Sequence, residues 1–171
     1  MNNSTNIKPL ALNNIQAAGI NAIYAVGAQG TLLQTTNGSD WKTLPTATAT
    51  NFNAIQLNTT KGLIAGDKGY LSIITIPTVA LTNIPLTTSN NLYDIALNTS
   101  NKAYIAGANG TLVSIPNITS PVPALASPQP AEDFRGICFK FGSNQIYAVG
   151  DNTAVYSYNR TQNGLSNTFN K

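Results

Sequence analysis

One short motif constrains this chain more than any other feature, because it occurs four times. Each copy has two apolar stretches around a small turn that begins with glycine, and the copies cover residues 23–33, 63–71, 104–112 and 147–155. Their first glycines, Gly27, Gly66, Gly107 and Gly150, follow one another at intervals of roughly 40 residues. A repeat of this length, made of short strands and turns, is typical of β-propeller blades. The sequence therefore predicts an all-β protein with four blades.

Each motif is flanked by further strand-like segments. An inner strand is expected before each motif, at residues 15–20, 52–57, 92–97 and 134–139. An outer strand is expected after the first three motifs, at 41–44, 78–86 and 122–125, before prolines that suit the end of an edge strand. Apolar residues alternate at period 2 and form no helical stripe, so each repeat predicts a four-stranded sheet.

These units divide the chain into one propeller domain, residues 1–171. The predicted blades are residues 14–50, 51–90, 91–131 and 132–171, and residues 1–13 are predicted to be an outer strand ahead of the first blade. Within that segment, residues 5–10 repeat the pattern of residues 82–86. They could close a four-bladed ring by pairing with the last blade, unless residues 165–169 take that place. The alternative is part of a larger propeller, completed by more chain or by self-association with a second copy.

The turns of the motif carry both a backbone constraint and a candidate surface. Gly30, Gly69 and Gly110 occupy a position that calls for positive φ, whereas the fourth copy has Thr153 there, so we expect its turn to differ. The middle of the turn varies between copies. If this face of the propeller binds a partner, its candidate residues are Gln29, Lys68, Asn109 and Asn152.

The residue types argue against an enzyme, a metal site or a cofactor. The chain has no histidine, which removes His-based triads and metal sites, and its one cysteine, Cys138, lies in an apolar stretch where we expect a buried, inert thiol. Glycosidase chemistry needs two facing carboxylates, which the few acidic residues do not suggest. A net charge of +3 from so few charged groups predicts no nucleic-acid partner, and no apolar run is long enough to span a membrane.

Residues 25–41 carry a resemblance to a known family. The run Ala-Val-Gly-Ala-Gln-Gly-Thr-Leu-Leu-Gln-Thr-Thr-Asn-Gly-Ser-Asp-Trp resembles the repeat of Asp-box (BNR) and photosystem II assembly-factor-like β-propellers. Asn37 stands where that pattern usually has aspartate, and the Asp-box part is present only in the first repeat. The resemblance implies a propeller that serves as a binding or assembly scaffold, and no chlorophyll-related role is carried over.

The leading functional hypothesis is therefore a non-catalytic scaffold that recognises a protein partner through a loop face. An alternative face on the opposite side is basic, with Lys42, Lys61, Lys102, Lys140 and Arg160. A carbohydrate-binding propeller is the rival class, and a fragment of an Asp-box glycosidase-like protein is a remote alternative. A charged fraction of only 9% in a chain rich in Asn and Thr favours a periplasmic, cell-envelope or secreted, bacterial location.

Overall fold

The computed structural model describes residues 10–20, 22–126 and 131–158, and these residues form four antiparallel sheets. The first sheet contains β1 (Leu12–Ala17), β2 (Ile23–Gly27), β3 (Leu32–Thr35) and β4 (Lys42–Thr43). The second contains β5 (Phe52–Leu57), β6 (Lys61–Gly66), β7 (Leu71–Thr75) and β8 (Ala80–Asn83). The third contains β9 (Leu92–Leu97), β10 (Ala103–Gly107), β11 (Leu112–Ile115) and β12 (Ala124–Leu125), and the fourth β13 (Phe134–Phe139), β14 (Ile146–Gly150) and β15 (Val155–Tyr158). Two single 3-10 turns, η1 (Ala28–Gly30) and η2 (Asp67–Gly69), join β2 to β3 and β6 to β7. The predicted all-β fold with four blades is confirmed.

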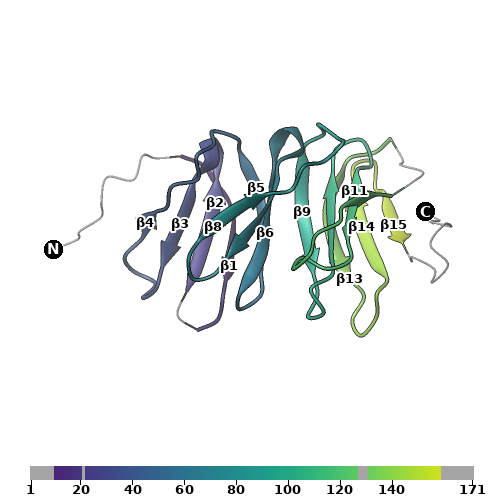
Figure 1. Cartoon of the computed structure of the whole chain (residues 1–171). Coiled ribbons are helices and arrows are strands. Elements are labelled where there is room, and N and C mark those ends of the chain that lie inside the picture. The colour runs from purple at the N-terminus through teal and green to yellow at the C-terminus, as the bar shows by residue number, and fades with distance from the viewer. Residues whose placement is uncertain (1–9, 21, 127–130, 159–171) are drawn as a thin grey trace.

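The blades stand side by side in a row (Figure 1). Their inner strands are neighbours in sequence order, with β1 against β5, β5 against β9 and β9 against β13. The first blade, in purple, and the last, in yellow-green, lie at opposite ends of the row. The described residues therefore form an open arc. The closing strand expected at residues 5–10 and the tail at 165–169 lie, apart from Leu10, outside the described residues.

Apolar packing occurs between blades. Three clusters of buried side chains each join two consecutive blades, for example Leu32 of the first blade with Phe52 and Ile55 of the second. Full burial of such a side chain contributes about 1.5–3 kcal/mol relative to exposure. A blade is thus stabilised mainly by its neighbours, because the second and third sheets bury both faces against the sheets before and after them, and the first and fourth sheets bury one face in the same way.

Polar side chains add a hydrogen bond between the inner strands of consecutive blades, and this bond recurs at each junction. Asn13 Nδ2 donates to the carbonyl of Phe52 at 2.8 Å, and Asn53 Nδ2 donates to the carbonyl of Leu92 at 2.9 Å. At the next junction the direction is reversed, since Asp94 Oδ2 accepts from the backbone N–H of Ile137 at 2.8 Å. Each bond satisfies a backbone group on an inner strand, which has no strand partner on its free edge.

Two expectations from the sequence are wrong. The first inner strand covers Leu12–Ala17 rather than residues 15–20, and Ile20 is exposed. The reason is that Leu12 pairs with Gly27 as Phe52 pairs with Gly66, so Leu12, Ile15 and Ala17 are the apolar positions of this strand.

Cys138 is also exposed rather than buried. It alternates with the buried Ile137 along β13 and therefore points to the other face of the sheet, which no further sheet of the described residues covers.

Candidate functional site

The structure brings the four turn residues of the first candidate face to one edge of the arc. Gln29, Lys68, Asn109 and Asn152 are all exposed, and all adopt positive φ, between 51° and 57°. Each lies in the turn between the second and third strands of its blade. The structure thus places them in equivalent positions, one in each blade.

The backbone of this edge is already used for contacts between blades. The N–H of Gln29 donates to Asn51 Oδ1 at 3.0 Å, that of Lys68 to Asn91 Oδ1 at 2.9 Å and that of Asn109 to Asp133 Oδ1 at 2.8 Å. In each case the acceptor directly precedes the inner strand of the next blade. These bonds fix the turn against the connection between blades, so the turn residues have a structural role.

In the first two turns, the same connection requires the glycine that follows the turn residue. A Cβ at Gly30 would lie 2.1 Å from the carbonyl oxygen of Thr48, and one at Gly69 would lie 2.2 Å from that of Thr88. Both glycines also have φ of +69°. Any other residue would clash with backbone and be strained as well.

The fourth turn has the same backbone conformation as the others, so the expectation that it differs is wrong. Thr153 has φ of 57° after Asn152 at 57°. The N–H of Gly150 donates to the Ala154 carbonyl at 3.1 Å, which matches the Gly27 to Thr31 bond of the first turn. A β-branched residue in this conformation costs on the order of 1–3 kcal/mol. Thr153 is exposed, and no connection to a further blade crosses it in the described residues.

Ionic contacts on this edge occur in the last blade. The guanidinium of Arg135 bonds both carboxylate oxygens of Asp151, at 3.1 and 3.0 Å, and Asp133 Oδ2 at 3.0 Å, while it lies 4.6 Å from the ring centroid of Tyr93. The hydrogen bond from Arg135 lowers the pKa of Asp151 below its usual value. Because Tyr93 belongs to β9, this group of residues connects the inner strands of the third and fourth blades.

The residues of the alternative basic face are spread over different blades. Lys42 lies on β4, Lys61 begins β6, and the ammonium of Lys102 lies 5.2 Å from the centroid of Tyr104. Lys140 lies in the turn that follows β13. Arg160 is outside the described residues.

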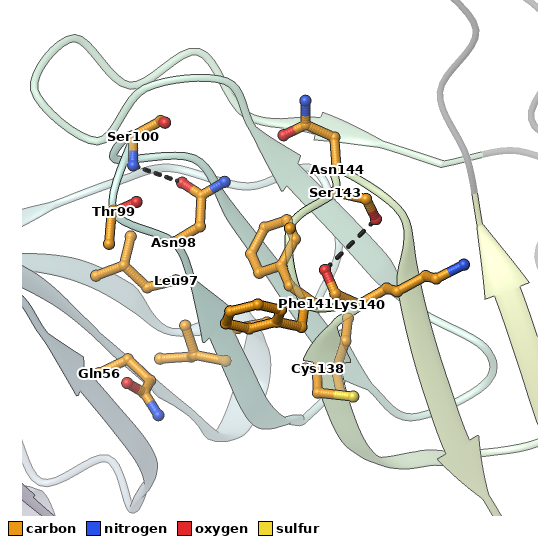
Figure 2. Close-up of a pocket in the computed structure, with 15 residues that line it drawn as sticks. Gln56, Leu97, Asn98, Thr99, Ser100, Cys138, Lys140, Phe141, Ser143 and Asn144 are labelled. Carbon is orange, nitrogen blue, oxygen red and sulfur yellow. Dashed lines mark hydrogen bonds between the residues drawn. The ribbon is translucent and has the colours of Figure 1, made fainter.

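Lys140 also lines a cleft that sequence reasoning missed (Figure 2). The cleft has a volume of about 660 Å³ and lies between the turn after β9 and the turn after β13, with Gln56 of β5 at one end. Its apolar lining comes from strand residues such as Ile95, Leu97 and Ile137, and its polar lining from the two turns. The lining residues from these turns are Asn98, Thr99, Ser100, Lys140, Phe141, Gly142, Ser143 and Asn144.

Both turns are held by their own hydrogen bonds. Asn98 Oδ1 accepts from the N–H of Ser100 at 3.0 Å and from that of Lys102 at 2.9 Å, and Ser143 Oγ donates to the Lys140 carbonyl at 3.4 Å. Phe141 is fully exposed, and Lys140 is exposed beside it. An aromatic residue in an otherwise polar turn is a sequence signal that could have indicated this site. The cleft itself could not be predicted, because its two sides are about 40 residues apart in the sequence.

The turn that resembles an Asp box, between β3 and β4, is held by Asn37. Its Oδ1 accepts from the N–H groups of Ser39 and Asp40, at 3.0 and 2.9 Å, and its Nδ2 donates to Asp40 Oδ2 at 2.8 Å. The amide oxygen of Asn37 thus accepts the backbone bonds that an aspartate could accept.

Two further findings bear on the class of site. In residues 10–20, 22–126 and 131–158, no group of three or more His, Cys, Asp or Glu is placed to hold a metal ion. The same part of the chain contains no helix long and apolar enough to cross a membrane.

Comparisons with known proteins show the fold. No protein-family model matches the chain, and no curated protein matches it by sequence. Among solved structures it is similar to YCF48 bound to D1 peptide, with 15% identity and a TM-score of 0.71 over 93% of this chain and 56% of that one. It is also similar to the RRP9 WD40 repeats, with 10% identity and a TM-score of 0.76 over 94% and 53%.

A third similar structure is PorZ, a bacterial surface component of the type-IX secretion system of Porphyromonas gingivalis. Identity is 13% and the TM-score is 0.65, over 95% of this chain and 22% of PorZ. The chain spans about half the length of YCF48 and of the RRP9 repeats. At these identities the comparisons establish a β-propeller architecture.

Proposed function

We propose that this protein is a non-catalytic binding module that takes a segment of a protein partner into the cleft between the third and fourth blades. The observation that carries the proposal is the cleft itself, with an apolar floor, polar turns on both sides and Phe141 exposed at its edge. Clefts with apolar linings and a few fixed polar groups are the usual form of a binding site. An extended peptide could place apolar side chains against Ile95 and Leu97 and an acidic group near Lys140.

The edge that carries the four turn residues Gln29, Lys68, Asn109 and Asn152, called the turn edge below, is the less favoured binding surface. Its backbone donors at Gln29, Lys68 and Asn109 are engaged by the next blade, and Asn109 Nδ2 donates to Asn90 Oδ1 at 3.3 Å. These contacts account for the conformation of the three turns without a bound ligand. The cleft residues Phe141 and Lys140 instead present exposed side chains to solvent.

A non-catalytic role is supported by the engagement of the described carboxylates. Asp67 accepts from the side-chain amides of Asn51 and Asn53, both at 2.9 Å, Asp94 accepts from backbone N–H groups, and Asp133 and Asp151 bond to Arg135. Each therefore has a structural partner, and none lines the cleft.

Family and location are part of the same proposal. Asn37 bonds its turn as the aspartate of an Asp box could, which supports a degenerate Asp box of the photosystem II assembly-factor-like type. The similar YCF48 structure holds a peptide, and the similar PorZ is a bacterial surface component. We place the protein outside the cytoplasm on this basis and on its low charge.

Selection from a phage-displayed peptide library tests the proposal. Selected peptides should bind the purified chain, and Phe141→Ala and Lys140→Glu should each weaken binding at least tenfold, which corresponds to about 1.4 kcal/mol. The turn-edge variants Lys68→Ala and Asn109→Ala are matched controls and should bind normally. Loss of binding in the controls alone would place the site on the turn edge. Binding to a glycan array but to no peptide would favour the carbohydrate alternative.

A further inference from the structure

The three junctions between blades inside the chain follow one pattern. In each junction, the earlier blade contributes a cross-strand pair from its second and third strands. The following blade contributes the first and fourth residues of its inner strand. The pairs are Val26 with Leu32, Ala65 with Leu71, and Ala106 with Leu112. They share buried clusters with Phe52 and Ile55, with Leu92 and Ile95, and with Phe134 and Ile137, respectively.

The two ends of the arc carry the same elements, and no further blade among residues 10–20, 22–126 and 131–158 covers them. In the last blade, Val149 pairs with Val155, and these residues are 47% and 53% exposed, whereas all six counterparts in the other blades are 0% exposed. In the first blade, Leu12 and Ile15 are 51% and 59% exposed, whereas their counterparts are at most 9% exposed. Each end thus presents one half of an apolar junction.

The turn edge of these ends differs from the internal junctions. Thr153 stands where the first and second blades have Gly30 and Gly69, at which a Cβ would clash with the connecting segment. Ala11 stands where the other blades have a side chain that accepts a hydrogen bond from the backbone N–H of the preceding turn, namely Asn51, Asn91 and Asp133. Both differences concern the covalent connection between blades. In the part of the chain that the structure describes, no connecting segment crosses the turn at Thr153.

We propose that two copies of this chain join head to tail at both ends and form one closed ring. The face with Val149 and Val155 of each copy covers the face with Leu12 and Ile15 of the other. Each chain supplies four sheets, so the ring has eight blades, which is within the usual range for propellers. Two copies of one heterologous interface close such a ring by two-fold symmetry. The covered share of YCF48 and of the RRP9 repeats, 56% and 53%, also leaves room for about as many blades again. This inference does not depend on the proposed peptide site.

Light scattering on the purified full chain, over a range of concentrations, tests the ring. We expect a particle of twice the 18.0 kDa chain mass. Ile15→Asp and Val155→Asp should each give single chains, because each variant places a charge in both junctions. Since both residues are exposed in one copy, the variants should keep the β circular dichroism of the parent. Val122→Asp, at an exposed position away from both ends, should leave the mass doubled.

Mixing separates this ring from other modes of association. Ile15→Asp retains an intact Val155 face and Val155→Asp retains an intact Ile15 face, so a mixture should form a two-chain species through one junction. A parent chain that stays single at every concentration, or that forms long polymers, would overturn the proposal. So would variants that keep the doubled mass, or a mixture that stays single.

Discussion

The second and fourth blades have the same strand pattern but different surroundings. Leu71 and Val155 occupy equivalent places, opposite Ala65 and Val149, yet Leu71 is fully buried and Val155 is half exposed. The difference comes from the neighbouring blade, since the third blade covers Leu71 and no blade among the described residues covers Val155. In this fold, a blade position therefore has no fixed contribution to stability. Its contribution depends on whether a junction is present.

The largest expected contrast is between truncations of these two residues. Leu71→Ala should lower the free energy of unfolding by about 2–5 kcal/mol, because it leaves a cavity in a packed junction. Val155→Ala should change it by less than about 0.5 kcal/mol when made together with Ile15→Asp, which keeps the chain single. Urea unfolding measures both. Equal losses would mean that the end face is covered within one chain.

Glycines give the next contrast. Gly69→Ala should destabilise by about 3 kcal/mol, because its Cβ would meet the Thr88 carbonyl at a left-handed φ. Gly142 has nearly the same φ, +70°, but no atom lies within 4 Å of the place that a Cβ would take, so Gly142→Ala should cost only about 1 kcal/mol. If thermal melts show the same loss for both, the close approach of the connection is not what requires glycine.

Asp94 tests the polar bonds of an internal junction. Asp94→Ala should cost about 2 kcal/mol, because it leaves the N–H groups of Ile95 and Ile137 without their acceptor. Burial raises the pKa of the Asp94 carboxyl, partly offset by these two backbone bonds.

The raised pKa predicts a pH dependence with a definite sign. The folded state holds the Asp94 proton more tightly than the unfolded state does. The neutral carboxyl therefore contributes its full stabilisation of the fold below the unfolded pKa of about 3.9, and this stabilisation is lost as pH rises through the folded pKa. The stability difference between parent and Asp94→Ala should therefore narrow as pH increases from acid toward neutrality. A difference that widens over that range would contradict the burial effect.

The smallest effect is expected at the end turn. Thr153→Gly should stabilise the single chain by about 1 kcal/mol, because it removes strain at a positive φ. Thr119 is exposed and has no positive φ, so Thr119→Gly should be neutral or destabilising. A destabilised Thr153→Gly variant would show that Thr153 makes a contact worth more than its strain.

The parts of the fold that repeat were the predictable parts. The glycines Gly30, Gly69 and Gly110 and the period-2 strands between them indicated four sheets, and these sheets are present. The sequence pattern misplaces the first inner strand because Ala17, at the end of β1, is a weak apolar signal. The sequence mispredicts the turn at Thr153, because threonine disfavours positive φ. The backbone hydrogen bond from Gly150 to Ala154 nevertheless holds this turn in the conformation of the other three.

The cleft and the exposed faces at the two ends of the arc depend on which blade lies next to a residue. The local sequence pattern does not contain this information. Cys138 lies in an apolar run, but its face of the last blade is covered by no other sheet of the described residues. The cleft arises where the turns at Asn98 and Lys140 meet across a junction. The turn residues were recognised as equivalent, although their backbone bonds to the next blade could not be seen from sequence.

Small-angle X-ray scattering on the homogeneous full chain tests the central claim most directly, because it distinguishes a closed ring from an open row of blades. The account predicts a compact, flat particle with a central channel and the volume of two chains. An elongated particle with the volume of one chain, matching the open arc of Figure 1, would contradict it.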